Sequence, residues 1–507
     1  MSRSAGIALD PARTEPLYRQ IFDQVVGRIQ SGAFPPGFRL PASRTLAEDL
    51  HTHRNTIVRA FEELAAAGFV VSTVGRGTFV ADELPSIGAF DPPSRTKLPW
   101  SSLVSRTSGA EPLGRLDRLS RPPLGKDAVN LSRMQPSDDL LPHELLRRCL
   151  DHVLQTRGGG ALGYAPREGL LRLRMLIVEE LARIGVPARA EDVLITTGSQ
   201  QALDLIARSL IDPGDAMLVE ESTYNGAINL LAAAGAKVVG VPSDEEGPDL
   251  AALEHPARSD AKGFYLMPNC GNPTGSCMPA ARRERLVAWS HRAGVPLIED
   301  DYGADLNLDG DSPPPALRAL SSDVIYVGTF SKKLIPALRV GFMVCPEALQ
   351  SRLVPLKHAM DLGTSVLLQY ALCEFISRGY LTAHLRRTVV EYRRRRDALV
   401  EVLDRHLLDA VSWKPPARGV LLWLTLPEWM DPVKVHRQCE IEGVLVTPGV
   451  LYSATGLNRR GLRLTYCAEP LDRVAEGALR LCRAIDRVAE GSDRNDRVAV
   501  ARAVEVI

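Results

Sequence analysis

Residues 193–220, VLITTGSQQALDLIARSLIDPGDAMLVE, contain the pattern that decides the fold of most of this chain. An apolar run at 193–197 is followed by a glycine, a helical stretch and a second apolar run at 216–220. Two short strands that flank a helix are typical of a βαβ unit, in which the strands run parallel within one sheet. The stretch therefore predicts an α/β fold.

The same alternation continues outward from this stretch, over residues 128–485. Further strand candidates are KVVGV (237–241), GFYLM (263–267), PLIED (296–300) and VIYVG (324–328). Helical patterns lie between them. We therefore expect a mostly parallel sheet with helices on both faces.

Length and composition limit the classes of protein to which the chain can belong. At 507 residues it is too long for one small core, so two or three domains are expected. The formal net charge of zero neither suggests nor excludes a nucleic-acid partner. No apolar run approaches the roughly 18 residues of a membrane span, and the N-terminus lacks an apolar signal core. We expect a cytoplasmic protein without a membrane partner.

The eight cysteines are scattered along the chain. They show neither CxxC spacing nor paired histidines, so reduced structural thiols are expected rather than a metal site.

Residues 16–80 form a self-contained pattern of three helices and a hairpin. Helices are expected over 16–31, 43–50 and 54–68, and Ser43 is placed to cap the second helix. Two short helices separated by a tight turn match the helix-turn-helix, whose second helix enters the major groove of DNA. FVVSTVGRGTFV (69–80) then predicts two strands joined around Gly75-Arg76-Gly77.

The third helix exposes Arg54, Asn55 and Thr56 in its first turn, followed by Arg59. These side chains donate hydrogen bonds to base edges or phosphates, and Arg76 at the hairpin tip suits the minor groove or a phosphate. Residues 1–80 contain nine arginines, no lysine and seven acidic residues, a net charge of only +2. A protein-interaction module is the alternative, but the positions of the arginines favour DNA.

The remaining boundaries follow from composition. Residues 81–127 are rich in Pro, Gly and Ser and lack periodicity, which predicts a flexible linker. Residues 486–507 are expected to form a polar, helical C-terminal tail. The basic run in EYRRRRDAL (391–399) is interpreted as a solvated helix face rather than a DNA contact.

Two motifs offer parts of a cofactor site. Ser199 and Gln200 follow Gly198 at the start of a helix, where backbone N–H groups, a hydroxyl and an amide can bind an anion. An ordinary strand–glycine–helix turn has the same pattern. Asp300 ends the strand PLIED at the carboxyl edge of the sheet, where it can keep a pyridine nitrogen protonated. The alternative for EDDY is a solvated acidic loop.

VIYVGTFSKKLIPALRVGF (324–342) places Lys332 just beyond another strand. Lysine forms a Schiff base with an aldehyde cofactor. Thr329 and Ser331 flank it as hydroxyls for a phosphate, and Arg339 offers a guanidinium for the same phosphate. These motifs follow one another along the chain in a fixed order: the turn at Ser199, Asn272, Asp300 to Tyr302, Ser331-Lys332 and Arg339. This order favours a site for pyridoxal 5'-phosphate (PLP) over the alternative that Lys332 is an ordinary surface lysine.

The stretch LYRQIFDQVVGRIQSGAFPPGFRLPASRTLAEDLHTHRNTIVRAFEELAAAGFVVSTVGRGTFV (17–80) resembles the GntR-type winged helix along its whole length. The resemblance implies DNA contacts by Arg44, by Arg54 to Thr56 and by the wing tip. His53 stands where a small hydroxyl residue usually caps the recognition helix, so a weaker cap is expected.

Nearly all of 128–470 resembles the fold type I aminotransferases, most closely the branch of aromatic and 2-aminoadipate aminotransferases. The resemblance implies a small C-terminal subdomain and a site shared by two subunits, with Tyr164 reaching the neighbour's phosphate. It also implies that Tyr224 stacks on the PLP ring and that Asn272 of NPTG (272–275), with Tyr302, binds the phenolic oxygen. Arg463 would clamp a substrate α-carboxylate.

A GntR-type domain joined by a linker to this domain is the plan of the MocR-type regulators. It implies a PLP-dependent DNA-binding transcription regulator that senses an amino compound through an aldimine at Lys332. A homodimer would bind a double-stranded operator with paired half-sites. The alternative is an active amino-acid aminotransferase with an autoregulatory DNA-binding domain, and a third is a winged helix on a scaffold without cofactor. The expected domains are 1–80, 81–127, 128–485 and 486–507.

Overall fold

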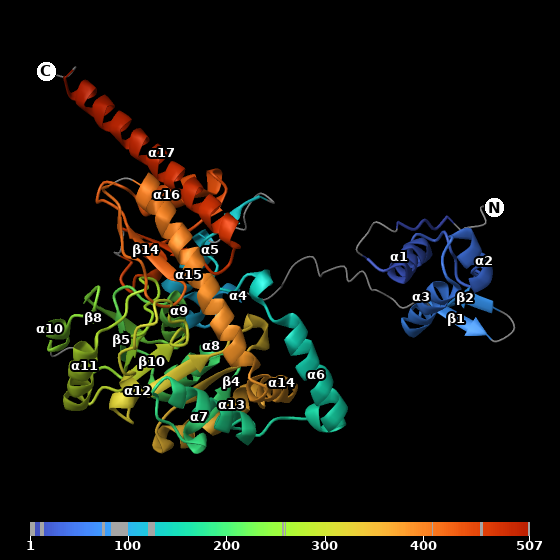
Figure 1. Cartoon of the computed structure of the whole chain (residues 1–507), viewed down its shortest axis with the longest axis horizontal. Coiled ribbons are helices and arrows are strands. Elements are labelled where there is room, and N and C mark those ends of the chain that lie inside the picture. Colours follow the sequence, from blue (N-terminus) through green and yellow to red (C-terminus); the bar gives the residue numbers. More distant parts are fainter. Residues whose placement is uncertain are drawn as a thin grey trace. The chain divides into compact units, whose positions relative to one another are not determined.

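The computed structural model describes residues 6–10, 15–73, 77–82, 100–119, 127–255, 258, 260–407, 409–456 and 460–504. The chain divides into two compact units, Met1–Leu103 and Val104–Ile507, each with its own core (Figure 1).

The N-terminal unit is a three-helix domain with a hairpin. Its elements are α1 (Leu17–Gln30), α2 (Ser43–Asp49), α3 (Arg54–Ala66), β1 (Val70–Thr73) and β2 (Gly77–Val80). Ile21, Val25 and Ile29 recur on one face of α1 and are buried with Ile57 and Leu64 of α3. This helical spacing of apolar residues is the pattern from which the helices were expected.

Two expectations about the helix caps had different outcomes. The residue that caps α2 is Ala42, and no side chain caps this helix, so the prediction that Ser43 caps it is wrong. Ser43 is already helical, and its Oγ accepts a hydrogen bond from Arg54 Nε at 3.4 Å. His53 stands at the N-cap of α3, and its side chain forms no capping hydrogen bond. This agrees with the expectation that His53 caps this helix less well than a small hydroxyl residue.

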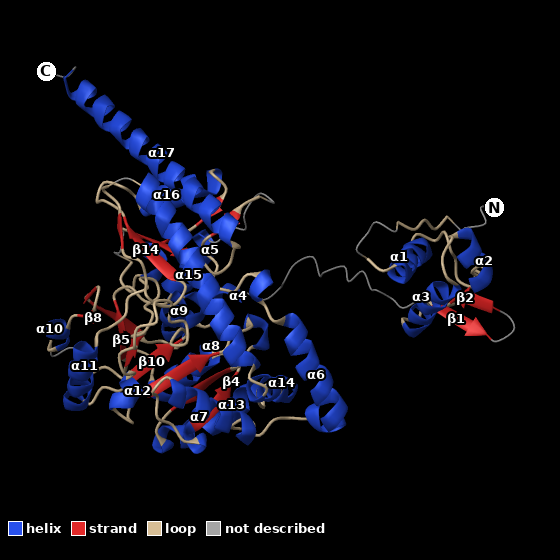
Figure 2. Cartoon of the chain, viewed as in Figure 1, coloured by secondary structure: helices blue, strands red, loops and turns tan. Residues whose placement is uncertain are grey.

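The C-terminal unit is built on a seven-stranded sheet (Figure 2). Its strands, in spatial order, are β4 (Val193–Thr196), β12 (Gly341–Val344), β11 (Ile325–Thr329), β10 (Leu297–Asp301), β9 (Phe264–Leu266), β5 (Ala216–Glu220) and β6 (Lys237–Val241). The six strands expected from the sequence are all present. The mostly parallel α/β sheet is confirmed.

Strand β12 was not anticipated and runs antiparallel to both of its neighbours. The segment between β11 and β12 contains only the short 3₁₀ turn η6 (Pro336–Leu338). A connection this short cannot hold a crossover helix, so the chain returns antiparallel.

Helices cover the sheet on both faces because alternate strand residues point to opposite sides. Leu194 and Met343 belong to a core shared with α8 (Ser199–Leu210), whereas Val193 and Ile195 pack toward α7 (Leu171–Arg183). The other helices of this larger part are α6 (His143–Arg157), α9 (Asn225–Ala233), α10 (Leu250–Leu253), α11 (Ala280–Ala293), α12 (Leu317–Leu320), α13 (Glu347–Asp361) and α14 (Val366–Ser377).

A smaller C-terminal subdomain follows the long helix α15 (Tyr380–His406). Its antiparallel sheet has the order β13 (Ser412–Trp413), β14 (Leu421–Thr425), β17 (Gly461–Thr465), β16 (Thr447–Pro448). It is covered by α16 (Pro432–Ile441) and α17 (Leu471–Val504), and β15 (Val444–Leu445) pairs with β3 (Val129–Asn130). The expected tail at 486–507 begins inside α17, which runs on without a break to Val504.

The expected linker at 81–127 contains helical segments in its described part. They are α4 (Trp100–Leu103), η1 (Arg106–Gly109) and α5 (Glu111–Leu119). Helix α5 packs against α9, so residues 111–119 are docked on the C-terminal unit rather than free.

The basic run in α15 is only half solvated. Arg393 and Arg394 are exposed, as expected, but Arg395 and Arg396 are buried. Arg395 forms ion pairs with Glu391 and with Asp139, both at 2.9 Å. The expectation of a solvated face is wrong for these two arginines, because Asp139 comes from a distant part of the chain.

All eight cysteines are free thiols. The described residues contain no cluster of His, Cys, Asp or Glu suited to a metal ion. None of the described helices is long and apolar enough to cross a membrane.

Candidate functional site

Lys332 lies just past β11, at the carboxyl edge of the sheet. Its Nζ donates a hydrogen bond to the carbonyl oxygen of Met134 at 2.7 Å. Burial lowers the pKa of the Lys332 amine below its usual range, and the positive charge of Arg463 acts in the same direction. Because the neutral amine is the nucleophilic form, this position suits a lysine that attacks a carbonyl carbon.

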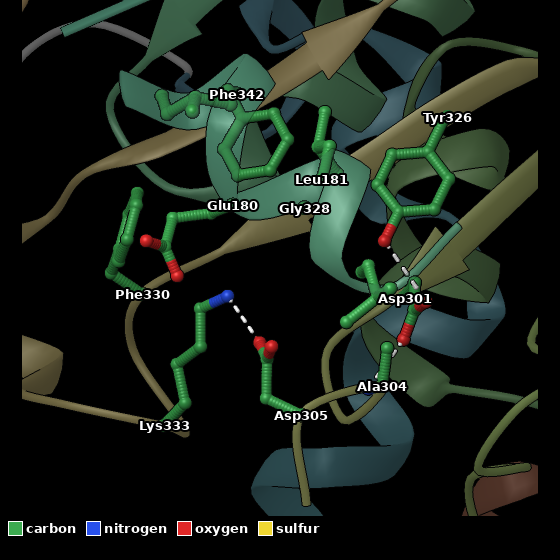
Figure 3. A pocket seen from close by; sticks show the side chains of 12 residues that line it. Glu180, Leu181, Asp301, Ala304, Asp305, Tyr326, Gly328, Phe330, Lys333 and Phe342 are labelled. Carbon is green, nitrogen blue, oxygen red and sulfur yellow. Dashed lines mark hydrogen bonds and ion pairs between the residues drawn. The ribbon is translucent and has the colours of Figure 1, made fainter. Parts of the chain in front are cut away.

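The adjacent Lys333 has a different environment. It pairs with Asp305 in a small pocket that also contains Glu180, Tyr326 and Phe330 (Figure 3). The cavity volume of about 10 Å³ accommodates no more than about one water molecule. The ion pair with Asp305 accounts for Lys333 as a structural residue, which leaves Lys332 as the reactive one.

Asp300 supplies a buried carboxylate at the end of β10. Tyr265 Oη, from the neighbouring strand β9, donates to its Oδ2 at 2.7 Å. Burial raises the pKa of Asp300 to about 7, while the Tyr265 hydrogen bond acts against this rise. A carboxylate in such surroundings gains from a cationic partner, such as a protonated pyridine nitrogen.

The whole EDDY segment is buried, so the alternative of a solvated acidic loop is wrong. Glu299 accepts hydrogen bonds from the backbone N–H groups of Leu317 and Arg318. Asp301 accepts from Asn269 and Tyr326 at 2.6 and 2.9 Å. Both carboxylates are thus occupied by structural hydrogen bonds, and Asp300 is the one near Lys332.

The phosphate end of the site, as we name it, is the turn at Gly198 with the residues around it. Gly198 has a φ of +83° and precedes the first turn of α8. A Cβ on Gly198 would lie 2.7 Å from Arg339 Nη2, and one on Gly341 would lie 2.7 Å from the Gly198 carbonyl carbon. These glycines leave a side-chain-free cradle at a helix N-terminus, which is an anion site.

Hydroxyl and cationic groups border this cradle. Ser199 begins α8, and Thr329 and Ser331 lie buried at the end of β11. The backbone N–H of Ser331 donates to Thr329 Oγ1 at 3.1 Å, and Arg339 donates to the Thr197 carbonyl at 3.3 Å. The residues that were expected to bind a phosphate therefore lie close together in the structure.

Tyr224 stands at the N-cap of α9, beside the phosphate end. Its Oη donates to Gln200 Oε1 at 3.2 Å, and Gln200 Nε2 donates to the Gly226 carbonyl at 3.2 Å. A Cβ on Gly226 would collide with the Tyr224 ring. The ring is held in place by these contacts.

Arg463, on β17, defines what we call the carboxylate end. Only 7% of it is exposed, yet the hydrogen-bond acceptors that it has among the described residues are all neutral. Nη2 donates to the Ser132 carbonyl at 2.6 Å, and Nη1 lies 3.3 Å from Asn272 Oδ1 and 3.2 Å from Met134 Sδ. Its Nε has no hydrogen-bond partner among the described residues. A buried cation with neutral partners and a spare donor is suited to an anionic ligand.

The residues present fit PLP. Besides Lys332, Asp300 and the glycine cradle, the buried hydroxyl of Tyr302 has no hydrogen-bond partner among the described residues. Such an orphan donor is costly unless a ligand satisfies it. In the described part of the chain, Asn272 Nδ2 donates only to Met134 Sδ, at 3.6 Å, a weak acceptor that an oxygen of a ligand can replace.

Tyr164 is the one expected cofactor residue that stays apart. Its side chain is 84% exposed on the single chain. The resemblance assigns it to a neighbouring subunit's phosphate, and this exposure agrees with such a role.

Three residues of the site were missed by sequence reasoning: Met134, Tyr265 and Tyr452. The Tyr452 ring lies 4.8 Å from Arg463 Cζ in a cation–π contact. Tyr265 sits in an apolar strand and resembles a core residue, although its hydroxyl contacts Asp300. A buried tyrosine beside a functional carboxylate is the signal that could have found it.

The expected DNA-binding residues gather on α2 and α3 of the N-terminal unit. Arg44, Arg54 and Asn55 are exposed, and Thr56 is half-buried. Arg59 is exposed, but its guanidinium lies over the Tyr18 ring at 3.9 Å. Arg76 lies outside the described residues.

Comparison with known proteins gives two family matches. The model of the aminotransferase class I and II family matches residues 126–481. The model of the bacterial regulatory proteins of the gntR family matches residues 17–80.

Two individual relatives illustrate these matches. The chain is 33% identical to the probable rhizopine catabolism regulatory protein MocR of Rhizobium meliloti, over 87% of this chain and 88% of that one. It is 36% identical to the 2-aminoadipate transaminase of Thermus thermophilus, over 76% of this chain and 98% of that one.

The crystal structure of LysN, an α-aminoadipate aminotransferase of Thermus thermophilus complexed with N-(5'-phosphopyridoxyl)-L-leucine, superposes with a TM-score of 0.71 at 32% identity. The match covers 78% of this chain and 100% of that chain.

Proposed function

Because the chain belongs to the aminotransferase class I and II family and, over residues 17–80, to the gntR family of bacterial regulatory proteins, we propose that it is a MocR-type transcription regulator. Its N-terminal unit binds DNA, and its C-terminal unit holds PLP and responds to an amino compound. The observation that carries the proposal is Arg463, a buried guanidinium with only neutral partners, in the same site as Lys332.

In this proposal the phosphate of PLP lies at the phosphate end, held by Ser199, Gln200, Thr329, Ser331 and Arg339, with Tyr164 of a second copy. When bound, PLP supplies an aldehyde carbon that reacts with amines and a ring that withdraws electrons.

The other site residues orient the cofactor and the ligand. Asp300 partners the ring nitrogen, the Tyr224 ring packs on the cofactor face, and Asn272 and Tyr302 donate to the phenolic oxygen. Lys332 Nζ provides the amine, and Arg463 orients the ligand's carboxylate through charge-assisted hydrogen bonds.

On the DNA side, α3 enters the major groove with Arg54, Asn55 and Thr56 toward the bases, as in other helix-turn-helix domains. Arg44, Arg59 and Arg76 contact the backbone or the minor groove. Two copies of the chain would place two such units on paired half-sites of a double-stranded operator. The exposed Tyr164 supports a homodimer, because it needs a second copy to meet a phosphate.

Helix α5 belongs to the segment that joins the two units of the chain, and it contacts residues next to the carboxylate end. Arg115 on α5 donates to the Ser453 carbonyl at 2.9 Å. Ser453 follows Tyr452, whose ring contacts Arg463. A ligand that moves Arg463 would therefore displace the contact point of α5 and bias the linker.

The test is the affinity of the PLP-loaded chain for its own upstream DNA, with and without each of a panel of amino acids. We expect at least one amino acid to change the affinity several-fold. Arg115→Ala should keep amino-acid binding but reduce this change, whereas Arg148→Ala, on an exposed helix face, should not. DNA affinity that is indifferent to both PLP and amino acids would refute the proposal.

A working aminotransferase is the second candidate function. The specific observation in its favour is that Asn272, Tyr302, Lys332 and Arg463, the residues transamination would use, are all present, with Asn272 and Arg463 in contact. Lys332 Nζ, with its lowered pKa, could carry a proton to and from the ligand's α-carbon. Release of about one 2-oxo acid per chain from an amino acid, without any effect on DNA binding, would favour this function.

A further inference from the structure

A short segment crosses the ligand site and contacts its main functional groups. We call Ser132–Ser137 the strap. Met134, in the middle of the strap, accepts the Lys332 hydrogen bond through its carbonyl oxygen at 2.7 Å. Its sulfur lies 3.2 Å from Arg463 Nη1 and 3.6 Å from Asn272 Nδ2. The backbone of Met134 therefore contacts the Lys332 amine, and its side chain lies against Arg463 and Asn272 at the carboxylate end.

The main chain of the strap is fixed at both ends. The Arg133 carbonyl accepts from Thr465 Oγ1 at 3.1 Å. At the other end the Ser137 N–H donates to the Cys467 carbonyl at 2.9 Å, and its hydroxyl accepts from the fully buried Arg395 at 2.6 Å. Since the backbone is anchored, only the flexible, unbranched side chain of Met134 can yield to a ligand.

The guanidinium gains little from Met134, because a thioether sulfur is a weak acceptor. A carboxylate at Arg463 forms charge-assisted hydrogen bonds that are roughly twice as strong as neutral ones. The carboxylate of a ligand therefore displaces the sulfur from Arg463. The methionine side chain must then share the remaining space with the substituent on the ligand's α-carbon.

On this basis, and resting on the proposed function, we propose that Met134 is the specificity-determining residue of the ligand site. It restricts the ligand to amino acids with compact substituents, of the size of glycine or alanine. A bulky substituent on the ligand's α-carbon would need the space that the Met134 side chain occupies beside Arg463. One methylene of steric mismatch in an apolar pocket is worth roughly 10- to 200-fold in discrimination, so truncating Met134 should have a large effect.

The experiment compares the wild-type chain with Met134→Ala and Met134→Leu, each loaded with PLP. Met175→Ala serves as the matched control, because Met175 is 52% exposed on α7. Glycine, L-alanine, L-leucine and L-phenylalanine are titrated while the visible absorbance of the bound cofactor is followed. Melting temperatures measured with the same amino acids give a second ranking that does not depend on absorbance.

We expect Met134→Ala to strengthen binding of leucine and phenylalanine about tenfold or more. Glycine and alanine should stay within roughly threefold, and Met134→Leu should retain the wild-type ranking. Equal changes for all four amino acids, or none, would overturn the role of Met134 while leaving the regulator proposal intact. A wild-type chain that shows no cofactor absorbance would instead remove the proposed function, and this inference with it.

Discussion

At the phosphate end of the site, Gly198 and Gly341 leave an open cradle beside Arg339. At the carboxylate end, the chain's own Met134 and Ser132 contact the buried Arg463. Both ends present a cation to an anionic group, but one is kept clear by glycines and the other is filled by the strap. A cofactor that remains bound needs a preformed site, whereas a ligand that signals must displace something when it binds.

The difference bears on the choice between regulator and enzyme. Displacement at the carboxylate end reaches Tyr452 and, through the Ser453 carbonyl, Arg115 of α5. Helix α5 also packs against α9, which begins directly after Tyr224, so α5 contacts both sides of the site. The contact on the carboxylate side is the hydrogen bond from Arg115 to the Ser453 carbonyl, and we propose that ligand binding reaches the linker through it.

The largest expected effect comes from removing the amine between the two ends. Lys332→Ala should abolish the absorbance band of the imine between the cofactor and the chain, because Lys332 is the amine that we propose to form it. Lys333 cannot replace it, since it is paired with Asp305. Lys414→Ala, which alters an exposed lysine, should retain the absorbance. A yellow Lys332→Ala protein would contradict the assignment.

Next in size is a change that breaks the carboxylate end alone. Arg463→Gln should weaken amino-acid binding about 10- to 100-fold, the range for hydrogen bonds to a charged group. Cofactor absorbance should persist, because Arg463 lies apart from the phosphate end. Titration with the best-binding amino acid measures the loss. Loss of the cofactor from Arg463→Gln would contradict the view that the carboxylate end binds the amino acid independently of the phosphate end.

A smaller effect is expected from a change that breaks the phosphate end alone. Gly198→Ala places a Cβ 2.7 Å from Arg339 and should weaken PLP affinity about tenfold. Gly294→Ala is the control for a Cβ at positive φ without a clash, because Gly294 has a φ of +69° and its Cβ would meet nothing within 4 Å. The backbone strain is larger at Gly198, whose ψ of 166° lies in a region that essentially only glycine adopts, than at Gly294 with its left-handed helical ψ of 23°, so the melting temperatures of both variants are measured alongside PLP affinity. Equal PLP affinities for the two variants would argue against the cradle.

The last expected effect concerns the ionisation of Asp300 in the cofactor-free chain, and it is an effect on stability rather than on ligand binding. The raised pKa of about 7 means that the folded state holds a proton that the unfolded state releases near pH 4. Stability is therefore lost as the pH rises toward 7, and Asp300→Asn avoids the loss. When the pH is raised from 5.5 to 8, the free energy of unfolding of the variant should increase by about 2 kcal/mol relative to that of the wild type. Urea unfolding at the two pH values measures this, with the exposed Asp409→Asn as control.

The sequence predicted the phosphate end better than the carboxylate end, for a physical reason. Ser199 and Lys332 each follow a strand whose apolar pattern is visible locally, Asp300 lies near the end of another, and the ends of such strands meet at one edge of the sheet. Met134 meets Lys332 across 198 residues and Arg463 across 329, with no local pattern around it. The buried pairing of Arg395 with Asp139 was hidden in the same way. Six strands and a mostly parallel sheet were predicted, but the antiparallel β12 depended on a connection too short for a helix.

Hydrogen exchange of the PLP-loaded chain, compared with and without a compact amino acid, shows where the structure responds to the ligand. We expect changed exchange in the strap, in residues 452–456 and in α5, with little change at 196–200 and 329–341. Changes confined to the phosphate end, or an unaltered strap and α5 when the ligand is bound, would contradict this expectation.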